Sequence, residues 1–146
     1  PPQLVSDMHF REQFYGYFEA GYGRGVDRRG RAARCEELQR HRRKFGLGAT
    51  RDFLKEADPF HDAESDVEYW SRVEEGFALI ASNPALRDSD DVLQISHGNT
   101  LLSLMHRFAP EGYDLSERPA NGSVTTLDFD TSKPIAEAVT VVSYNQ

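Results

Sequence analysis

The chain has 146 residues, of which 38% are hydrophobic and 28% charged, and its formal net charge is −7. This composition predicts a single globular domain over residues 1–146 and excludes a second domain of comparable size. No apolar run approaches the roughly 20 residues of a membrane span, so no membrane partner is expected. The N-terminus Pro1-Pro2-Gln3 does not have the pattern of a signal peptide.

The charge is unevenly distributed along the chain. Residues 24–51 hold ten Arg or Lys against three acids, which gives +7 and leaves −14 for the remainder. The acidic total argues against nucleic acid as a partner, whereas the basic segment suits an anionic substrate. The single cysteine, Cys35, permits no disulfide within the chain, which favours a reducing, cytoplasmic location.

Residues 10–22 are dense in aromatic side chains and carry two acids, Glu12 and Glu19. Glu19 is expected to be solvated. Partial desolvation of Glu12 among the rings would instead suit it as a proton donor near neutral pH. The following residues 21–30 are rich in Gly and Arg and predict a loop. They do not form a P-loop, because no Gly-Lys-Ser/Thr ending follows the glycines.

A basic helix is predicted from Arg31 to about Phe45, where Gly46 and Gly48 end it, and a short helix is predicted over residues 50–57. Residues 21–62 are therefore interpreted as an inserted basic helical cap. Its exposed charges are either an ordinary solvated face or part of a mobile cover over an anionic site.

Ser65-Asp66-Val67-Glu68 is a capping box that opens a further helix, and this helix should end before Asn83-Pro84. An apolar stripe with a 3.6-residue period marks the face that the helix should bury. The stripe consists of Val67, Trp70, Val73, Phe77 and Ile80.

Residues 92–105 predict a strand that turns directly into a helix. Val92–Ile95 is typical of a short buried strand, and Leu101–Met105 follows with helical spacing. The corner Ser96-His97-Gly98 would place His97 at the carboxyl edge of a sheet, where open α/β sheets bind ligands. The N–H groups that begin the helix would stabilise an anion there. The alternative is a buried histidine that only closes the strand.

The C-terminal residues predict an antiparallel pair of strands. Ser123–Phe129 and Ala138–Tyr144 favour strands, and residues 131–134 suit the turn between them. Such a pair is typical of an edge added to a mostly parallel sheet. The fold class expected from these patterns is therefore α/β.

Four stretches together resemble the histidine phosphatase superfamily, the phosphoglycerate mutase-like proteins. Val92–Thr100 is similar to the second histidine motif of that family. Phe10-Arg11-Glu12 and Tyr15–Ala20 are similar to its Leu-x-Glu and Phe-Gly-x-Trp-Glu-Gly segments. Their order and spacing agree over nearly the whole chain, and the resemblance implies a three-layer sandwich with a mostly parallel sheet flanked by helices. The other two matches are Ala63-Glu64-Ser65 followed by Arg72, and Asn121-Gly122-Ser123-Val124.

The resemblance implies a role for each residue matched at the site. His97 would hold the transferring phosphoryl group, Glu12 would donate a proton to the leaving alcohol, and the backbone of Gly98 and Asn99 would contact phosphate or substrate. No metal or other cofactor is implied. The remaining histidines have no partners at ligand spacing and are expected to be structural or exposed: His9, His41, His61 and His106.

The nucleophilic histidine of the family lies in an Arg-His-Gly motif at the end of its first strand, and this chain has no such motif. The resemblance covers the C-terminal two-thirds of the family's domain, so two N-terminal βα units, roughly 60 residues, are not matched. We expect the sequence to belong to a longer chain, because removal of a central strand would leave unpaired edges. The 146 residues alone are then expected to be inactive.

Three functions are compatible with these observations. The leading hypothesis is a phosphomonoester hydrolase that acts through a phosphohistidine on a small phosphorylated substrate. The alternatives are a mutase, which returns the phosphoryl group to its substrate, and a non-catalytic phosphate-binding or regulatory module. The identity of the substrate and the oligomeric state stay open, a homodimer being one option.

Overall fold

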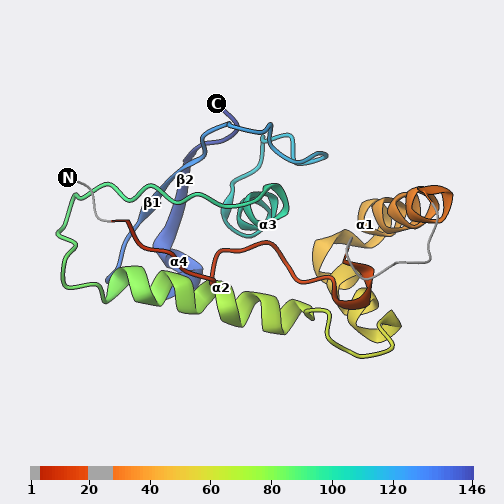
Figure 1. The fold of residues 1–146 in the computed structure, drawn as a ribbon. Coiled ribbons are helices and arrows are strands. Elements are labelled where there is room, and N and C mark those ends of the chain that lie inside the picture. Colours follow the sequence, from red (N-terminus) through yellow and green to blue (C-terminus); the bar gives the residue numbers. More distant parts are fainter. Residues whose placement is uncertain (1–3, 20–27) are drawn as a thin grey trace. The chain divides into compact units, whose positions relative to one another are not determined.

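The computed structural model describes residues 4–19 and 28–146 (Figure 1). Contacts divide the chain into two compact units, which are described separately. Unit 1 consists of Pro1–Glu12 and Ser71–Gln146, and unit 2 consists of Gln13–Trp70. The predicted loop at residues 21–30, including its glycines, lies mostly outside the described residues, and the first long helix begins at Arg28.

Unit 2 is built from the 3-10 helix η1 (Gly16–Phe18), helix α1 (Arg28–Ala57) and the first residues of helix α2 (Asp66–Ala81). Helix α1 is interrupted at Gly46, whose φ of 88° and ψ of 175° are non-helical. This φ is strained for residues with a side chain, so glycine is required at the break. The predicted stop at Gly46 and the predicted helix at residues 50–57 are both present.

The capping box of α2 is confirmed. The Glu68 N–H donates to Ser65 Oγ at 3.2 Å, and the Ser65 N–H donates to Glu68 Oε2 at 2.9 Å. The predicted stripe is only partly correct. Val73 and Phe77 are buried, but Val67 is 79% exposed and Tyr69 is fully buried instead. The helical face that is buried is therefore rotated from the predicted one at the beginning of α2.

Asp58 joins α1 to the segment that precedes α2. Its two carboxylate oxygens accept four backbone N–H groups, those of Tyr17, Phe60, Asp62 and Ala63, at 2.8–3.3 Å. Gly16 has a φ of +56°, and a Cβ placed there would overlap the Asp58 carboxylate. The close approach of η1 to Asp58 therefore depends on Gly16.

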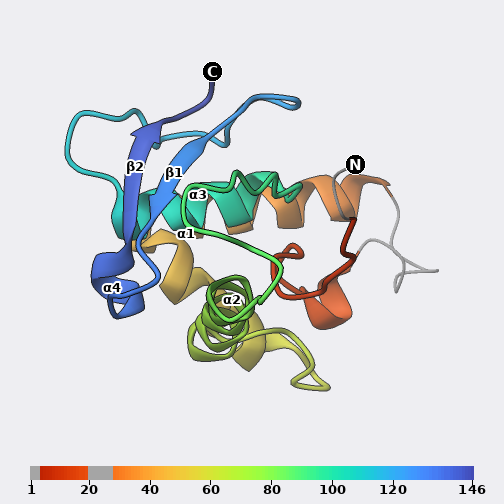
Figure 2. The ribbon, with the colours of Figure 1, turned by 90° about the vertical axis from the view of Figure 1, so that its left-hand side faces the viewer.

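Unit 1 contains the remainder of α2, helix α3 (Gly98–Phe108), strand β1 (Thr126–Phe129), helix α4 (Ile135–Ala138) and strand β2 (Val139–Ser143). The predicted antiparallel pair is confirmed, with Leu127 opposite Val141 and Phe129 opposite Val139. Helix α3 packs along β2, as Figure 2 shows. Its apolar face meets the sheet in a cluster of buried residues: Met105, Val141 and Tyr144.

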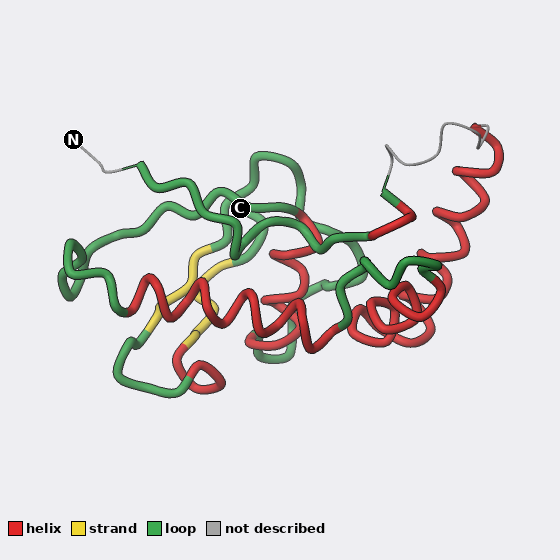
Figure 3. The backbone as a smooth tube through the Cα atoms, turned by 60° about the horizontal axis from the view of Figure 1, so that its bottom comes forward, coloured by secondary structure: helices red, strands yellow, loops and turns green. Residues whose placement is uncertain are grey.

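The expected three-layer sandwich with a mostly parallel sheet is wrong for this structure. In the described residues the sheet has two strands, and they are antiparallel (Figure 3). Residues 92–95 form no strand: no backbone hydrogen bond joins them to another described residue, and Leu93 and Ile95 are 85% and 84% exposed. The physical reason is that a strand needs a partner, which an apolar run cannot supply by itself.

None of the helices in the described ranges is both long enough and apolar enough to cross a lipid bilayer.

We expect Asp58→Ala to lower the Tm of the protein by several degrees at pH 7, because four backbone N–H groups, that of Ala63 among them buried, lose their acceptor. Thermal denaturation followed by circular dichroism measures the effect. Asp62→Ala is the matched control, since Asp62 is an exposed acid of the same loop. Equal Tm values for the two variants would contradict the role of Asp58.

The Tm difference between the wild type and Asp58→Ala should depend on pH. Burial acts to raise the pKa of Asp58, but the four N–H donors outweigh it and lower the pKa below its ordinary value. The stabilisation is therefore complete above the ordinary aspartate pKa of about 3.9 and is lost as the pH falls through the lower folded value. The Tm difference between the wild type and Asp58→Ala should shrink in strong acid.

Candidate functional site

The candidate site lies at the beginning of α3 in unit 1. His97 precedes the helix with extended backbone, φ −124° and ψ 158°, and its carbonyl oxygen accepts the N–H of Leu101 at 3.0 Å. The His97 side chain is exposed. The alternative of a buried structural histidine is therefore excluded, and the imidazole is accessible beside the positive end of the helix dipole.

Glu12 meets the same helix end from 87 residues earlier in the chain. Its Oε2 accepts the backbone N–H of Asn99 at 3.2 Å, and Thr100 Oγ1 lies 3.3 Å from its Oε1. The Glu12 side chain is half-buried. The carboxylate thus satisfies one of the N–H groups that the first turn of a helix leaves without a helical partner. The structure therefore places Glu12 against the first turn of α3, which His97 immediately precedes.

The segment that presents Glu12 has no regular secondary structure and is held by side chains. Arg72 of α2, 8% exposed, donates through Nη1 to the carbonyl oxygens of His9 at 2.6 Å and Arg11 at 3.1 Å. The hydroxyl of Ser96 donates to the carbonyl oxygen of Phe10 at 2.6 Å. Backbone groups on both sides of Phe10 are therefore fixed to α2 and to the corner before α3.

Phe10 itself anchors the segment by packing. Its ring meets that of Phe77 edge to face at 5.2 Å, and a Cβ added at Gly76 would lie 2.6 Å from the Phe10 ring. Gly76 therefore permits a close approach that any side chain would prevent. This contact stabilises the position from which Glu12 reaches α3.

Arg118 is a residue of this site that the sequence analysis missed. Its side-chain carbons cover Gly98: a Cβ added there would lie 3.3 Å from Arg118 Cδ and 3.5 Å from Arg118 Cβ. Arg118 is exposed, and the stem of this cationic side chain lies against the first residue of α3. Nothing in the loop sequence marks this arginine, because its proximity to α3 depends on the path of the whole 110–119 segment.

The other residues of the matched stretches have structural roles here. Glu64 Oε2 accepts the N–H of Phe14 at 2.9 Å, and the Glu64 N–H donates to the Phe14 carbonyl. Glu19 Oε1 accepts the N–H of Tyr15 at 3.0 Å. Gly122 adopts a φ of 80° in a turn, after which Val124 pairs with Gln146. These contacts fix the local backbone conformation of the segments to which the residues belong.

The histidines outside the site contact neighbouring side chains or backbone groups. His9 Nδ1 lies 2.6 Å from an oxygen of Asp7, the ring of His41 stacks on Phe53 with centroids 4.6 Å apart, and His61 contacts the Lys55 carbonyl. Over residues 4–19 and 28–146, no three or more His, Cys, Asp or Glu side chains form a group that could hold a metal ion.

The site combines an accessible imidazole, a helix N-terminus, a carboxyl group and an arginine. These groups can hold an oxyanion and transfer a proton at nearly the same place. A phosphate bound at the helix end would compete with the Glu12 carboxylate for the Asn99 N–H, since both are anions that accept from the same donor.

Comparison of the chain with protein-family models, with curated proteins and with solved structures gives no match. The resemblance to the histidine phosphatases therefore rests on the residues of the sequence.

We expect Arg72→Met to lower the free energy of unfolding by roughly 1–3 kcal/mol, because two partly buried carbonyl oxygens lose their charged donor. Urea denaturation measures this change. The Asn99 amide should also exchange hydrogen faster, because Glu12 is no longer held against it. Arg87→Met is the matched control at an exposed position. Unchanged stability and unchanged Asn99 exchange would show that Arg72 does not position the segment.

Proposed function

We propose that the chain belongs to a phosphomonoester hydrolase of the histidine phosphatase type. In this proposal His97 and the beginning of α3 hold the phosphoryl group, and Glu12 donates a proton to the leaving alcohol. The supporting observation is that the Glu12 carboxylate lies against Asn99 and Thr100, directly after the exposed His97. The nucleophilic histidine is proposed to come from sequence outside these 146 residues.

The proposed reaction has two steps. A nitrogen of the nucleophilic histidine attacks phosphorus while the bond from phosphorus to the alcohol oxygen breaks, and protonated Glu12 gives its proton to that oxygen. Water then attacks the phosphohistidine, Glu12 accepts a proton from the water, and inorganic phosphate and free histidine result. His97, the Gly98 and Asn99 backbone and Arg118 would stabilise the charge on the equatorial oxygens in both steps.

The proposal includes a small phosphorylated substrate and a cytoplasmic location. The net charge of +7 over residues 24–51 would raise the local concentration of an anionic substrate, and the lone Cys35 suits a reducing compartment. No contact among the described residues favours the mutase alternative over hydrolysis.

We expect His97→Ala to weaken the binding of inorganic phosphate at least threefold. The measurement is a phosphate titration followed by amide NMR shifts, which should be largest at Gly98, Asn99 and Thr100. Binding should also weaken with added salt, since the attraction is electrostatic. His106→Ala, an exposed histidine in the last turn of α3, is the matched control and should bind like the wild type. Shifts located elsewhere, or equal affinity for both variants, would refute the phosphate site.

We expect Glu12→Gln to bind inorganic phosphate more tightly at pH 7, because the amide removes a negative charge from the place that phosphate occupies. In the intact protein the same change should slow the hydrolysis of alkyl phosphates far more than that of 4-nitrophenyl phosphate, whose leaving group needs no proton. Equal slowing of both substrates would show that Glu12 is not the proton donor to the leaving group. Phosphate binding without any turnover would replace the hydrolase by a binding module.

A further inference from the structure

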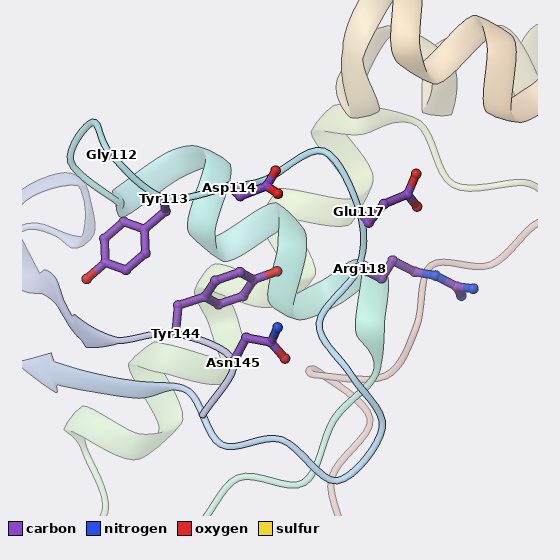
Figure 4. A pocket seen from close by; sticks show the side chains of 7 residues that line it. All are labelled: Gly112, Tyr113, Asp114, Glu117, Arg118, Tyr144 and Asn145. Carbon is purple, nitrogen blue, oxygen red and sulfur yellow. The ribbon is translucent and has the colours of Figure 1, made fainter.

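A cavity of about 300 Å³ lies in unit 1 between the 112–118 loop and the residues that follow β2 (Figure 4). Its volume is at the lower end of the range for small-molecule pockets, so it suits a small ligand. Its walls are mainly polar or aromatic side chains: Tyr113, Asp114, Glu117, Arg118, Tyr144 and Asn145.

The Tyr144 hydroxyl is the most informative group in the wall. Tyr144 is 8% exposed, and its hydroxyl is buried with no hydrogen-bond partner among the described residues. Buried tyrosine hydroxyls usually have a partner, because an unsatisfied one is costly. The ring cannot turn toward water, since it is packed against Met105 and Val141 and meets Tyr113 edge to face at 6.2 Å. A bound ligand would supply the missing partner.

The neighbouring polar groups are fixed and offer both donors and acceptors. Asn145 Oδ1 accepts the Ala120 N–H at 2.8 Å, which orients the Asn145 amide. Asp114 Oδ1 accepts from the hydroxyl and the N–H of Ser116. These bonds lower the pKa of Asp114, so it is an ionised acceptor at neutral pH. In Figure 4 the Tyr144 hydroxyl and the Asn145 amide lie on the same side of the cavity, and the guanidinium of Arg118 points away from them.

The side chains that line the cavity favour ligands that carry hydroxyl groups. Hydroxyl groups both donate and accept, so they match a wall that offers the Asp114 carboxylate together with the Asn145 amide and the Tyr144 phenol. The Asp114 carboxylate in this wall disfavours a second anionic group beside it. An alkyl group would leave the polar wall without partners, which is costly.

The cavity adjoins the proposed phosphate site. Arg118 belongs to both, since it lines the cavity and its side-chain carbons cover Gly98 at the beginning of α3. A phosphomonoester with its phosphate beside His97 could therefore extend past Arg118 into the cavity.

We propose that this cavity binds the alcohol part of the substrate and that this alcohol is small and polyhydroxylated, like a sugar. The inference rests on the proposed function of His97 and names the substrate class for it.

The test compares three probes by NMR titration: glucose 6-phosphate, hexyl phosphate and inorganic phosphate. The two esters share a phosphate and six carbons and differ in their hydroxyl groups. The wild type should bind glucose 6-phosphate more tightly than hexyl phosphate, with added amide shifts at Tyr113, Asp114 and Asn145. Tyr144→Phe should weaken glucose 6-phosphate binding roughly three- to tenfold, the usual value of one hydrogen bond, and leave the other two affinities unchanged.

Tyr144→Phe should fold normally, because it keeps the packed ring and removes only a hydroxyl without a partner among the described residues. Its Tm should equal or exceed that of the wild type. Tyr17→Phe, an exposed tyrosine of unit 2, is the matched control. Equal wild-type affinity for the two esters, or no effect of Tyr144→Phe, would overturn the inference while phosphate still binds at α3. Failure of all three probes to shift Gly98–Thr100 would instead overturn the proposed function.

Discussion

The candidate site depends on the buried guanidinium of Arg72. The residues before Glu12 form no helix or strand, so their carbonyl oxygens have no regular backbone partners. Arg72 supplies donors to two of these carbonyls from α2, and Ser96 supplies one to a third from the corner before α3. The irregular segment before Glu12 is thereby fixed both to α2 and to the corner before α3. Without this fixation the Glu12 carboxylate would have no defined position relative to His97.

The position of Glu12 links its protonation to the binding of an anion. In the structure its carboxylate already occupies the helix end, where it accepts the Asn99 N–H. A second anion would be repelled by it, whereas protonation of Glu12 removes the charge and weakens its hold on that N–H. In the proposed hydrolysis, the proton that Glu12 gives to the leaving alcohol would also be the proton that frees the Asn99 N–H for the phosphate.

The sequence predicts local features better than distant ones in this protein. The capping box at Ser65, the helix break at Gly46 and the antiparallel pair each follow from a few adjacent residues, and all are present. The parallel sheet was wrong because the apolar run at residues 92–95 predicts an extended backbone but not the strand beside it. Val67 was predicted to lie on the buried face of α2 but is exposed, because a 3.6-residue period defines the buried face of a helix only to within a fraction of a turn.

The candidate site also contains features that the sequence predicts and features that it does not. The resemblance implies one site for Glu12 and His97, and in the structure Glu12 contacts the first turn of α3, which follows His97. Arg118 was not predicted, because its contact with Gly98 depends on the path of an irregular loop. The Tyr144 hydroxyl was also not predicted. A strand pattern indicates that its ring is buried but does not reveal that the buried oxygen lacks a partner among the described residues.

The exposed run Val92–Ile95 also affects the colloidal behaviour of the chain. Extended backbone without hydrogen-bonded neighbours, carrying exposed Leu93 and Ile95, has the character of an aggregation-prone edge. Three exposed acids, Asp88, Asp90 and Asp91, stand immediately before it and repel a second copy of the segment at neutral pH. Because this repulsion is electrostatic, added salt should screen it and lower the solubility of the chain.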